Sequence, residues 1–223
     1  MTTGEGGAVY TNDTLLHRII NSLRDWGRDC ICPSGVDNTC GHRYDGVYGE
    51  LPKGYDHKYV YSHFGYNLKA TDLQAAIGVA QLAKIDSFVE KRRKNFDLLY
   101  MLLEDAGMEE HFILPKATAD TKPSWFAFIL TLNDKAKEKG LTREKIVRYI
   151  ESKNIQTRML FAGNIVKQPC FDDIRGDKLK YRIIGDLKNT DKIMNDTFLV
   201  GVYPGLDEDR IKYMAKTITE AVK

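Results

Sequence analysis

The chain has 223 residues, of which 43% are hydrophobic and 29% are charged, and its formal net charge is +2. This length suffices for one large domain or two small ones, and the near-neutral charge indicates no nucleic acid or other polyanion as partner. No apolar run approaches the roughly 20 residues of a membrane helix, and the N-terminus lacks the basic and apolar regions of a signal peptide. We therefore expect a cytoplasmic protein without a membrane partner, whose four cysteines stay reduced.

The chain opens on a glycine-rich turn. Residues 2–7 read TTGEGG and run into a short strand expected over residues 8–10. Because a free N-terminus seldom needs an ordered glycine turn, we expect further sequence upstream of Met1. An amphipathic helix follows from Asn12, since apolar residues recur at spacings of three and four as far as Trp26, and Gly27 ends it.

Three cysteines stand within eleven residues directly after this helix. Arg28 to Gly41 reads RDCICPSGVDNTCG, which places Cys30, Cys32 and Cys40 among Pro, Gly and Asn residues that cannot continue a helix. Three soft ligands on one loop indicate a metal site or an iron–sulfur cluster. The spacing Cys-x-Cys-x7-Cys is neither the CxxC pair of a zinc ribbon nor the run of the common ferredoxins.

From these residues alone, two kinds of metal site remain open. The three loop thiols with His42 as fourth ligand would suit a structural zinc, and the chain would then be a non-catalytic metal-binding or interaction domain. We expect the three thiols to lie close together even without a metal. Cys170, in KQPCF, is interpreted as a separate buried or neutral thiol. A disulfide between Cys30 and Cys40 would reflect air oxidation only.

The loop continues to residue 65 without a helix or strand pattern and is rich in Tyr, Gly and His. Its aromatic content argues against disorder, so residues 28–65 are predicted to be an ordered functional insertion. His57 and His63 are interpreted as surface or hydrogen-bonded histidines rather than catalysts.

A capping box of Thr71 and Gln74 opens a helical region that extends to about residue 105, with a bend at 84–87 and Gly107 as C-cap. The later periodicities predict strands over 125–132, 155–161 and 198–202, and helices over 142–152 and 207–222. This order predicts a small two-layer α+β domain. We place the domain boundary so that residues 1–85 and 86–223 form two domains.

Several stretches together resemble one enzyme family. TTGEGGAV, GYNLKATDLQAAIG (65–78) and VGVYPGLDEDRI (200–211) are similar to the DegT/DnrJ/StrS sugar aminotransferases. Other stretches resemble a narrower subfamily, the iron–sulfur CDP-4-keto-6-deoxyglucose 3-dehydrases. These stretches are RDWGRDCICPSGVDNTCGHR, LPKGYDHKYVYSHFGYN, PSWFAF, TRMLFAGN and NTDKIMN. The resemblance implies an α/β fold of the aspartate-aminotransferase type (fold type I). The chain would hold the end of its large pyridoxal-phosphate-binding domain and the small C-terminal domain.

The resemblance also implies cofactors, a substrate and partners. Enzymes of the subfamily use pyridoxal or pyridoxamine 5′-phosphate and a [2Fe–2S] cluster to remove the 3-hydroxyl of CDP-4-keto-6-deoxyglucose, for the 3,6-dideoxyhexoses of lipopolysaccharide O-antigen. A histidine replaces the lysine of the aminotransferases, so the cofactor stays in its amine form and the histidine acts as base. An NADH-dependent iron–sulfur reductase supplies single electrons, and active sites form in a homodimer.

Site residues carry over from matching motifs. Asn67 and Lys69 match residues at the cofactor phosphate of the partner subunit, and Arg158 and Asn164 would face the sugar nucleotide. The three loop cysteines would supply three of the four cluster ligands. The simpler interpretations are a turn asparagine, a solvated lysine and a salt-bridged arginine.

The resemblance places two essential residues before the chain. By the register of the motif, the catalytic histidine lies about two residues before Met1, and the fourth cysteine lies further upstream. We therefore expect neither dehydrase activity nor stable cofactor binding from this chain alone. We also expect it to self-associate or to have a disordered 28–65 loop. A pyridoxal-phosphate-dependent nucleotide-sugar aminotransferase is the competing enzyme interpretation, and a lysine at that upstream position would favour it.

Overall fold

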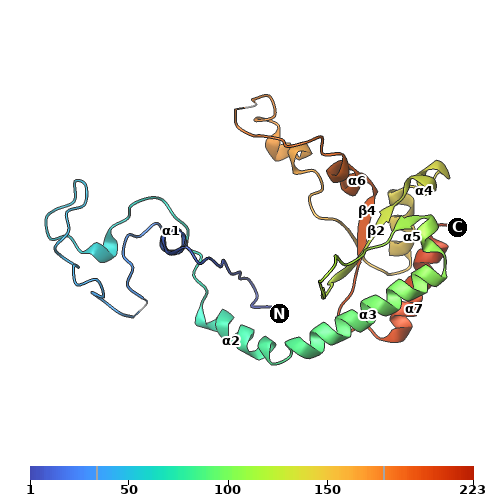
Figure 1. Ribbon diagram of the computed structural model, residues 1–223, viewed down its shortest axis with the longest axis horizontal. Helices are drawn as coiled ribbons and strands as arrows, with labels where there is room; N and C mark the ends of the chain where they lie inside the picture. Colours follow the sequence, from blue (N-terminus) through green and yellow to red (C-terminus); the bar gives the residue numbers. More distant parts are fainter. Residues whose placement is uncertain (34, 178) are drawn as a thin grey trace. The chain divides into compact units, whose positions relative to one another are not determined.

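The computed structural model describes residues 1–33, 35–177 and 179–223 and divides into two compact units, unit 1 (Met1–Ala83) and unit 2 (Lys84–Lys223) (Figure 1). The division falls at the break between two helices, α2 (Asp72–Leu82) and α3 (Ile85–Asp105), where the sequence predicts a bend. None of the helices in the described ranges combines the length and apolar character needed to cross a membrane.

Unit 1 consists of two α-helices joined by a long irregular segment. α1 (Thr14–Arg24) starts at Asp13, whose carboxylate accepts hydrogen bonds from the first-turn N–H groups. At the start of α2, Thr71 and Gln74 form the predicted capping box. Between the helices lies a 3-10 turn, η1 (His57–Tyr59). The long segment is tied at its base by two isolated antiparallel bridges, Asp25 with Asn67 and Arg28 with Tyr61.

Two predictions for the start of unit 1 need correction. Residues 8–10 form no strand, because no neighbouring strand pairs their backbone and their side chains are exposed. α1 ends at Arg24 rather than at Trp26, because Trp26 and Gly27 both adopt left-handed backbone angles, with φ of 58° and 83°. A Cβ on Gly27 would lie 1.9 Å from the carbonyl oxygen of His63, so the close approach of the two segments requires glycine.

Unit 2 is built on a four-stranded antiparallel sheet in the order β1-β2-β4-β3. Its strands are β1 (Phe112–Ile113), β2 (Ala127–Leu132), β3 (Thr157–Met159) and β4 (Thr197–Gly201). In the central pair, Phe128 lies opposite Val200 and Leu130 opposite Phe198. Side chains alternate across a strand, so these four fully buried residues share one face of the sheet.

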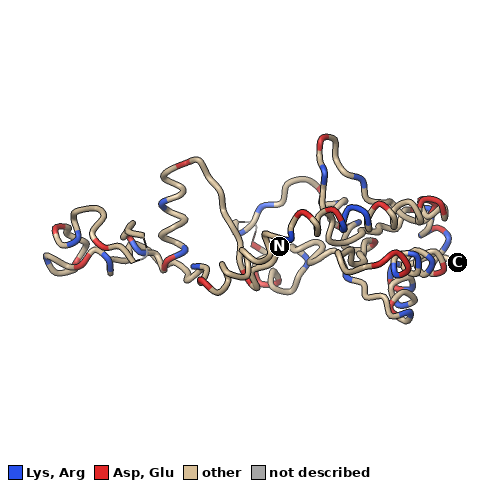
Figure 2. The backbone as a smooth tube through the Cα atoms, turned by 90° about the horizontal axis from the view of Figure 1, so that it is seen from below, with Lys and Arg blue, Asp and Glu red and all other residues tan. Residues whose placement is uncertain are grey.

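Helices α3, α5 (Arg143–Ser152) and α7 (Glu208–Glu220) supply the apolar residues that pack against this face. Thr142 and Asp207, the first residues of two predicted helices, act as N-caps, and both accept first-turn hydrogen bonds. Basic and acidic positions are interspersed along the helices of unit 2 (Figure 2). From the helix predicted over 207–222, the apolar residues at spacings of three and four are all buried, as are residues from α3 and α5: Ile211, Met214, Ala215, Ile218 and Val222, with Phe96, Leu99, Leu103, Ile146 and Ile150. The two-layer prediction is confirmed for this part of the sheet.

Several short elements of unit 2 were not predicted: β1, α4 (Asp134–Glu138), α6 (Lys188–Asp196), and the 3-10 turns η2 (Met108–Glu110), η3 (Ile165–Lys167) and η4 (Pro169–Phe171). α6 has no side-chain cap, since Leu187 precedes it with a φ of 55°, so the usual start signal is missing. The predicted strands over 125–132 and 155–161 are longer than β2 and β3, and β4 begins one residue earlier than expected.

Candidate functional site

The cysteine loop lines a cleft of about 710 Å³ within unit 1. Its lining includes Arg18 and Ser22 from α1 together with Cys30, Cys32 and His63. Ser22 lies 3.3 Å from the Nε2 atom of His63, which matches the expectation of a hydrogen-bonded histidine. The cleft therefore places two of the three loop thiols beside polar and basic side chains.

Two of the loop thiols are in different electrostatic surroundings. Burial raises the pKa of Cys30, and the neighbouring thiols of Cys32 and Cys40 act in the same direction. Hydrogen bonds from Thr39, whose backbone N–H lies 3.3 Å from the sulfur, lower the pKa of Cys32. The thiolate is the metal-binding form of cysteine. Cys32 is therefore the thiol that this loop best prepares as a ligand.

The loop as described is not a closed metal cage. All four cysteines are free thiols, and within the described ranges no group of three or more His, Cys, Asp or Glu side chains is arranged to hold a metal ion. His42, the candidate fourth zinc ligand, is 77% exposed and lies 3.8 Å from Asp45. Cys170 is exposed and belongs to unit 2, so its interpretation as a buried thiol is wrong. The donor chemistry fits a soft metal centre, but the three thiols are not gathered around one.

Asn67 and Lys69 lie together, as their motif suggests. The ammonium group of Lys69 donates hydrogen bonds to Asn67 Oδ1 at 2.8 Å and to Asp25 Oδ1 at 2.7 Å. It also lies 3.5 Å from the ring centre of Trp26. Because the carbonyl end of the Asn67 amide is occupied by Lys69, its NH₂ group is left to donate elsewhere.

Arg158 and Asn164, the candidate substrate residues, have different surroundings in unit 2. Arg158 is exposed on the edge strand β3, and its guanidinium donates to the carbonyl of Thr157 at 2.9 Å. Asn164 is 3% exposed; its amide donates to Asp191 at 2.7 Å and its oxygen accepts from the N–H of Val166. Arg158 is thus accessible to a ligand. Both ends of the Asn164 side chain, by contrast, make hydrogen bonds within unit 2.

Sequence reasoning missed the charged residues that tie the cysteine loop to η1. His57 donates from Nε2 to Asp29 at 2.7 Å, and this hydrogen bond lowers the pKa of Asp29. Arg43 makes a two-point ion pair with Asp56. The available signal was the run Asp-His-Lys at 56–58, three polar side chains in a loop otherwise rich in aromatic residues.

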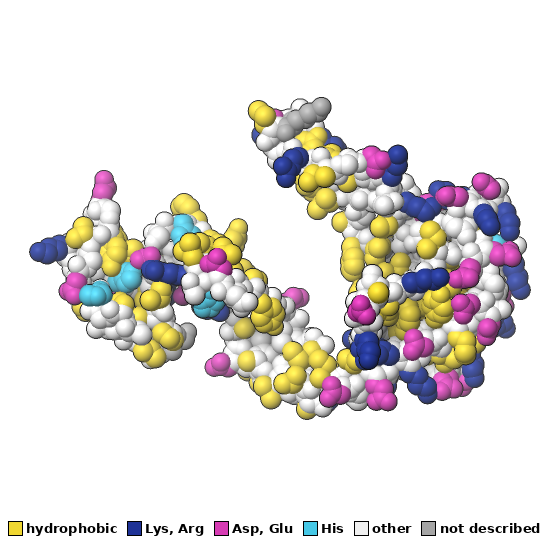
Figure 3. All heavy atoms as spheres, viewed as in Figure 1, with side chains coloured by type: hydrophobic (Ala, Val, Ile, Leu, Met, Phe, Trp, Pro, Cys, Tyr) yellow, Lys and Arg dark blue, Asp and Glu magenta, His cyan; other side chains and the backbone are white. Residues whose placement is uncertain are grey.

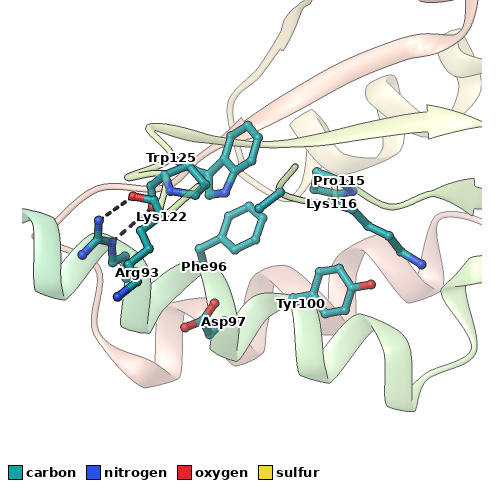
Figure 4. Close-up of a pocket in the computed structure, with 10 residues that line it drawn as sticks. Arg93, Phe96, Asp97, Tyr100, Pro115, Lys116, Lys122 and Trp125 are labelled. Atoms are coloured by element: carbon teal, nitrogen blue, oxygen red, sulfur yellow. Dashed lines mark hydrogen bonds between the residues drawn. The ribbon is translucent and has the colours of Figure 1, made fainter. Parts of the chain in front are cut away.

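A second cleft, of about 440 Å³, lies within unit 2 (Figure 4). Its wall is aromatic: Phe96 stacks on Trp125 with ring centres 5.5 Å apart and on Tyr100 at 6.4 Å. Arg93 is held at its rim by hydrogen bonds to the carbonyl groups of residues 122–123. None of the site residues predicted from the sequence lines this cleft.

Comparisons with known proteins show which proteins the chain is similar to. It is 49% identical over 99% of its length to the lipopolysaccharide biosynthesis protein RfbH of Salmonella typhimurium and covers 48% of that protein. It is also 49% identical over its full length to a dTDP-4-dehydro-2,6-dideoxy-D-glucose 3-dehydratase of Saccharopolyspora spinosa, covering 46%. The chain thus spans about half the length of these curated relatives.

A solved structure shows the same fold. The GDP-4-keto-6-deoxy-D-mannose-3-dehydratase of E. coli, solved with hydrated PLP, matches 93% of this chain and 48% of its own, with a TM-score of 0.68 and 23% identity. The fold is therefore that of the fold type I pyridoxal-phosphate enzymes, of which this chain has about half, as the motifs imply. The sequence model of one family matches residues 1–219. The chain belongs to the DegT/DnrJ/EryC1/StrS aminotransferase family.

Proposed function

We propose that the chain is the C-terminal part of a sugar-nucleotide 3-dehydratase that deoxygenates C-3 of CDP-4-keto-6-deoxyglucose for O-antigen synthesis. One observation carries this proposal: Cys30, Cys32 and Cys40 stand on one loop beside a cleft, in a chain 49% identical to a 3-dehydratase and to a lipopolysaccharide biosynthesis protein. An ordinary aminotransferase has no need of such a loop.

The three loop thiols are proposed to hold a [2Fe–2S] cluster together with a fourth cysteine from the sequence upstream. When bound, such a cluster supplies single-electron transfer, here from an NADH-dependent iron–sulfur reductase. The loop contributes a thiol at Cys32 that hydrogen bonds from Thr39 favour as thiolate. The partly buried Cys30 limits the access of solvent to one edge of the site.

Asn67 and Lys69 are proposed to bind the phosphate of pyridoxamine 5′-phosphate in the partner subunit of a homodimer. When bound, this cofactor supplies an electron sink for the carbon–oxygen cleavage. The amide NH₂ of Asn67 is available as a donor because Lys69 occupies its oxygen. Lys69 supplies positive charge and orients Asn67, while Asp25 fixes the position of the ammonium group.

In unit 2, the exposed guanidinium of Arg158 is proposed to contact the diphosphate of the sugar nucleotide, since Arg binds phosphate oxygens in a bidentate manner. Asn164 is proposed to act on the same ligand indirectly, because its side chain is committed to Asp191 and to the backbone of Val166. Its role would then be to hold the segment after β3 in a binding conformation.

The cluster is tested on the full-length protein, which supplies the fourth cysteine, by anaerobic reconstitution with ferrous iron and sulfide, followed by iron, sulfide and zinc analysis and a visible spectrum. The matched variants are Cys40→Ser and Cys170→Ser. We expect the protein to be coloured and to contain sulfide. Both properties should be lost in Cys40→Ser and retained in Cys170→Ser. Colourless protein with one zinc per chain would replace the dehydratase with the non-catalytic zinc-binding interpretation.

The activity is tested with CDP-4-keto-6-deoxyglucose, reductase and NADH. We expect no turnover from this chain alone, because the catalytic histidine is expected upstream of Met1. Turnover by the chain alone would refute that assignment. The residue at this upstream position separates the two enzyme interpretations, since lysine indicates an aminotransferase and histidine a dehydratase.

A further inference from the structure

The residues from Asp56 to Lys58, named here the 56–58 turn, make three separate contacts with the cysteine loop. The first is made by Asp56, which accepts two hydrogen bonds from the guanidinium of Arg43, at 3.0 and 2.7 Å. The backbone N–H of His57 also donates to the carbonyl of Arg43 at 2.9 Å. A bidentate charged pair of this kind fixes both distance and orientation.

The second contact is made by His57, whose Nε2 donates to Asp29 at 2.7 Å. The His57 side chain is only 12% exposed, and its ring stacks on Tyr48 with ring centres 5.1 Å apart and an interplanar angle of 4°. The backbone N–H of Asp29 donates to the carbonyl of Val60 just beyond the turn. This end of the loop is therefore held by side chain and backbone together.

The third contact is an ion pair between the ammonium group of Lys58 and the carboxylate of Asp37. Arg43 also lies 3.5 Å from Asp37, so the first and third contacts share a partner. Both groups of the Lys58 pair are more exposed than those of the other two contacts. Since exposed ion pairs contribute little, this should be the weakest of the three.

The partners of the 56–58 turn bracket the cysteines along the chain. Asp29 precedes Cys30, Asp37 stands between the second and third cysteines, and Arg43 follows Cys40 by three residues. Three consecutive side chains thus fix the start, the middle and the end of the cysteine loop. Unit 1 has little apolar burial with which to order this loop, so polar contacts must offset its conformational entropy.

We infer that the 56–58 turn is the positioning element that holds the cysteine loop in place, so that Cys30, Cys32 and Cys40 can close on a metal centre completed by the upstream cysteine. This inference rests on the proposed function. The turn contacts the cysteine loop and not the metal, and in this it resembles residues that orient metal ligands by hydrogen bonds. Loss of such groups lowers metal affinity by roughly 10- to 100-fold. The expected order of effect is His57, then Asp56, then Lys58, following burial.

The variants are His57→Ala, Asp56→Asn and Lys58→Gln, with Lys53→Gln, an exposed lysine of the same loop, as matched control. Asp56→Asn keeps one side-chain oxygen for the cap on the turn and removes the charge and one of the two acceptors of Arg43. His57→Gln retains a side-chain N–H and should recover part of the loss.

Two measurements are made on each variant, the first in the full-length protein that supplies the fourth cysteine and the second in this chain. The first is the rate at which a chelator removes iron after anaerobic reconstitution with iron and sulfide. The second is the rate at which a maleimide labels the three thiols without metal, located by peptide mapping. We expect iron loss roughly 10- to 100-fold faster in His57→Ala, faster labelling of Cys30 in the same variant, and neither change in Lys53→Gln.

The outcomes separate this inference from the proposed function. If the unaltered full-length protein holds iron and sulfide and the turn variants release iron no faster than Lys53→Gln, the inference is overturned and the cluster stands. If the unaltered full-length protein takes up neither element, the cluster proposal fails and the labelling rates alone decide the inference. Unchanged labelling in all three turn variants would then overturn the inference as well.

Discussion

The two units of this chain are stabilised in opposite ways. In unit 2, apolar side chains from helices α3, α4, α5 and α7 and from strands β1, β2 and β4 form one buried cluster. In the described part of unit 1, Val60 is the one hydrophobic side chain that is buried, and neither α1 nor α2 has a buried residue. Figure 3 shows hydrophobic side chains on the surface of both units, and those of unit 1 include Leu15, Phe64 and Leu73.

This difference shows which interactions stabilise each unit. The stability of unit 2 is explained by the burial of apolar area, which contributes about 25 cal/mol per Å². Unit 1 is instead held by hydrogen bonds, ion pairs and cation–π contacts, among them those of Lys69, Arg43 and His57. Unit 2 should therefore unfold cooperatively, and unit 1 should loosen contact by contact.

The largest expected effect comes from removing a leucine in each unit. Leu130→Ala should reduce the free energy of unfolding of unit 2 by about 2–5 kcal/mol, because Leu130 is 0% exposed in the centre of the sheet. Leu15→Ala, at a leucine that is 65% exposed on α1, should change stability by less than about 0.5 kcal/mol.

Urea unfolding measures both variants, because the chain has one tryptophan in each unit. Trp125 fluorescence in a Trp26→Phe background follows unit 2, and Trp26 fluorescence in a Trp125→Phe background follows unit 1. Equal losses from the two leucine variants would contradict the contrast between the units.

A polar residue of unit 2 should come next in size. Asn164→Ala should lower the stability of unit 2 by about 1–3 kcal/mol, because it leaves the buried N–H of Val166 and one bond to Asp191 unmatched. Asn189→Ala, at an exposed position of α6, is the control and should cost less than about 0.5 kcal/mol. The same Trp125 signal measures both. An Asn164→Ala variant as stable as its control would restore a direct substrate role for this side chain.

The elements that the sequence predicted well are those whose signals are local. Thr71 with Gln74 was identified as a capping box, and the helices predicted from residues 142 and 207 have Thr142 and Asp207 as their caps in the structure. The break between α2 and α3 and the inward face of α7 also followed from periodicity. The irregular 28–65 segment followed from its composition.

The elements that the sequence missed depend on distant partners. β1 is two residues long and exists only through its pairing with β2, and the expected strand at residues 8–10 finds no partner. The contacts of the 56–58 turn join residues up to 28 positions apart. The spacing of Cys30, Cys32 and Cys40 identified the loop, but no periodicity or cap signal shows which carboxylate a given lysine or histidine will meet.

A smaller effect is expected from removing one cap in each unit. Thr142→Ala should reduce the stability of unit 2 by about 1 kcal/mol, since α5 is packed into the core through Ile146 and Ile150. Thr71→Ala removes the same kind of hydrogen bond from α2, which has no buried residue. Its loss should appear as local fraying, measured by faster amide exchange at Gln74, without a change in the urea midpoint.

Thr→Ser at both positions keeps the hydroxyl group and is the control. A global loss from Thr71→Ala as large as that from Thr142→Ala would mean that α2 is part of a cooperative core after all.

The smallest expected effect is a difference in acid sensitivity. In unit 1, the Lys58 ammonium lowers the pKa of Asp37, and the Arg43 guanidinium lowers the pKa of Asp56. A carboxylate whose pKa is lowered by folding contributes stability above its unfolded value, near 3.8, and that contribution is lost as the pH falls through the folded value. The loop of unit 1 should therefore loosen below about pH 3.8.

Unit 2 has a similar carboxylate in Asp191, whose pKa is lowered chiefly by Lys167, but its apolar core does not depend on that charge. On titration from pH 7 to pH 2, the Trp26 signal should therefore change before the Trp125 signal. Asp37→Asn with Lys58→Gln removes the exposed pair and should shrink the early change, whereas coincident transitions in the unaltered chain would show that the units share one cooperative structure. The same order should hold in 1 M salt at pH 7, where screening over about 3 Å weakens exposed ion pairs and leaves apolar burial intact.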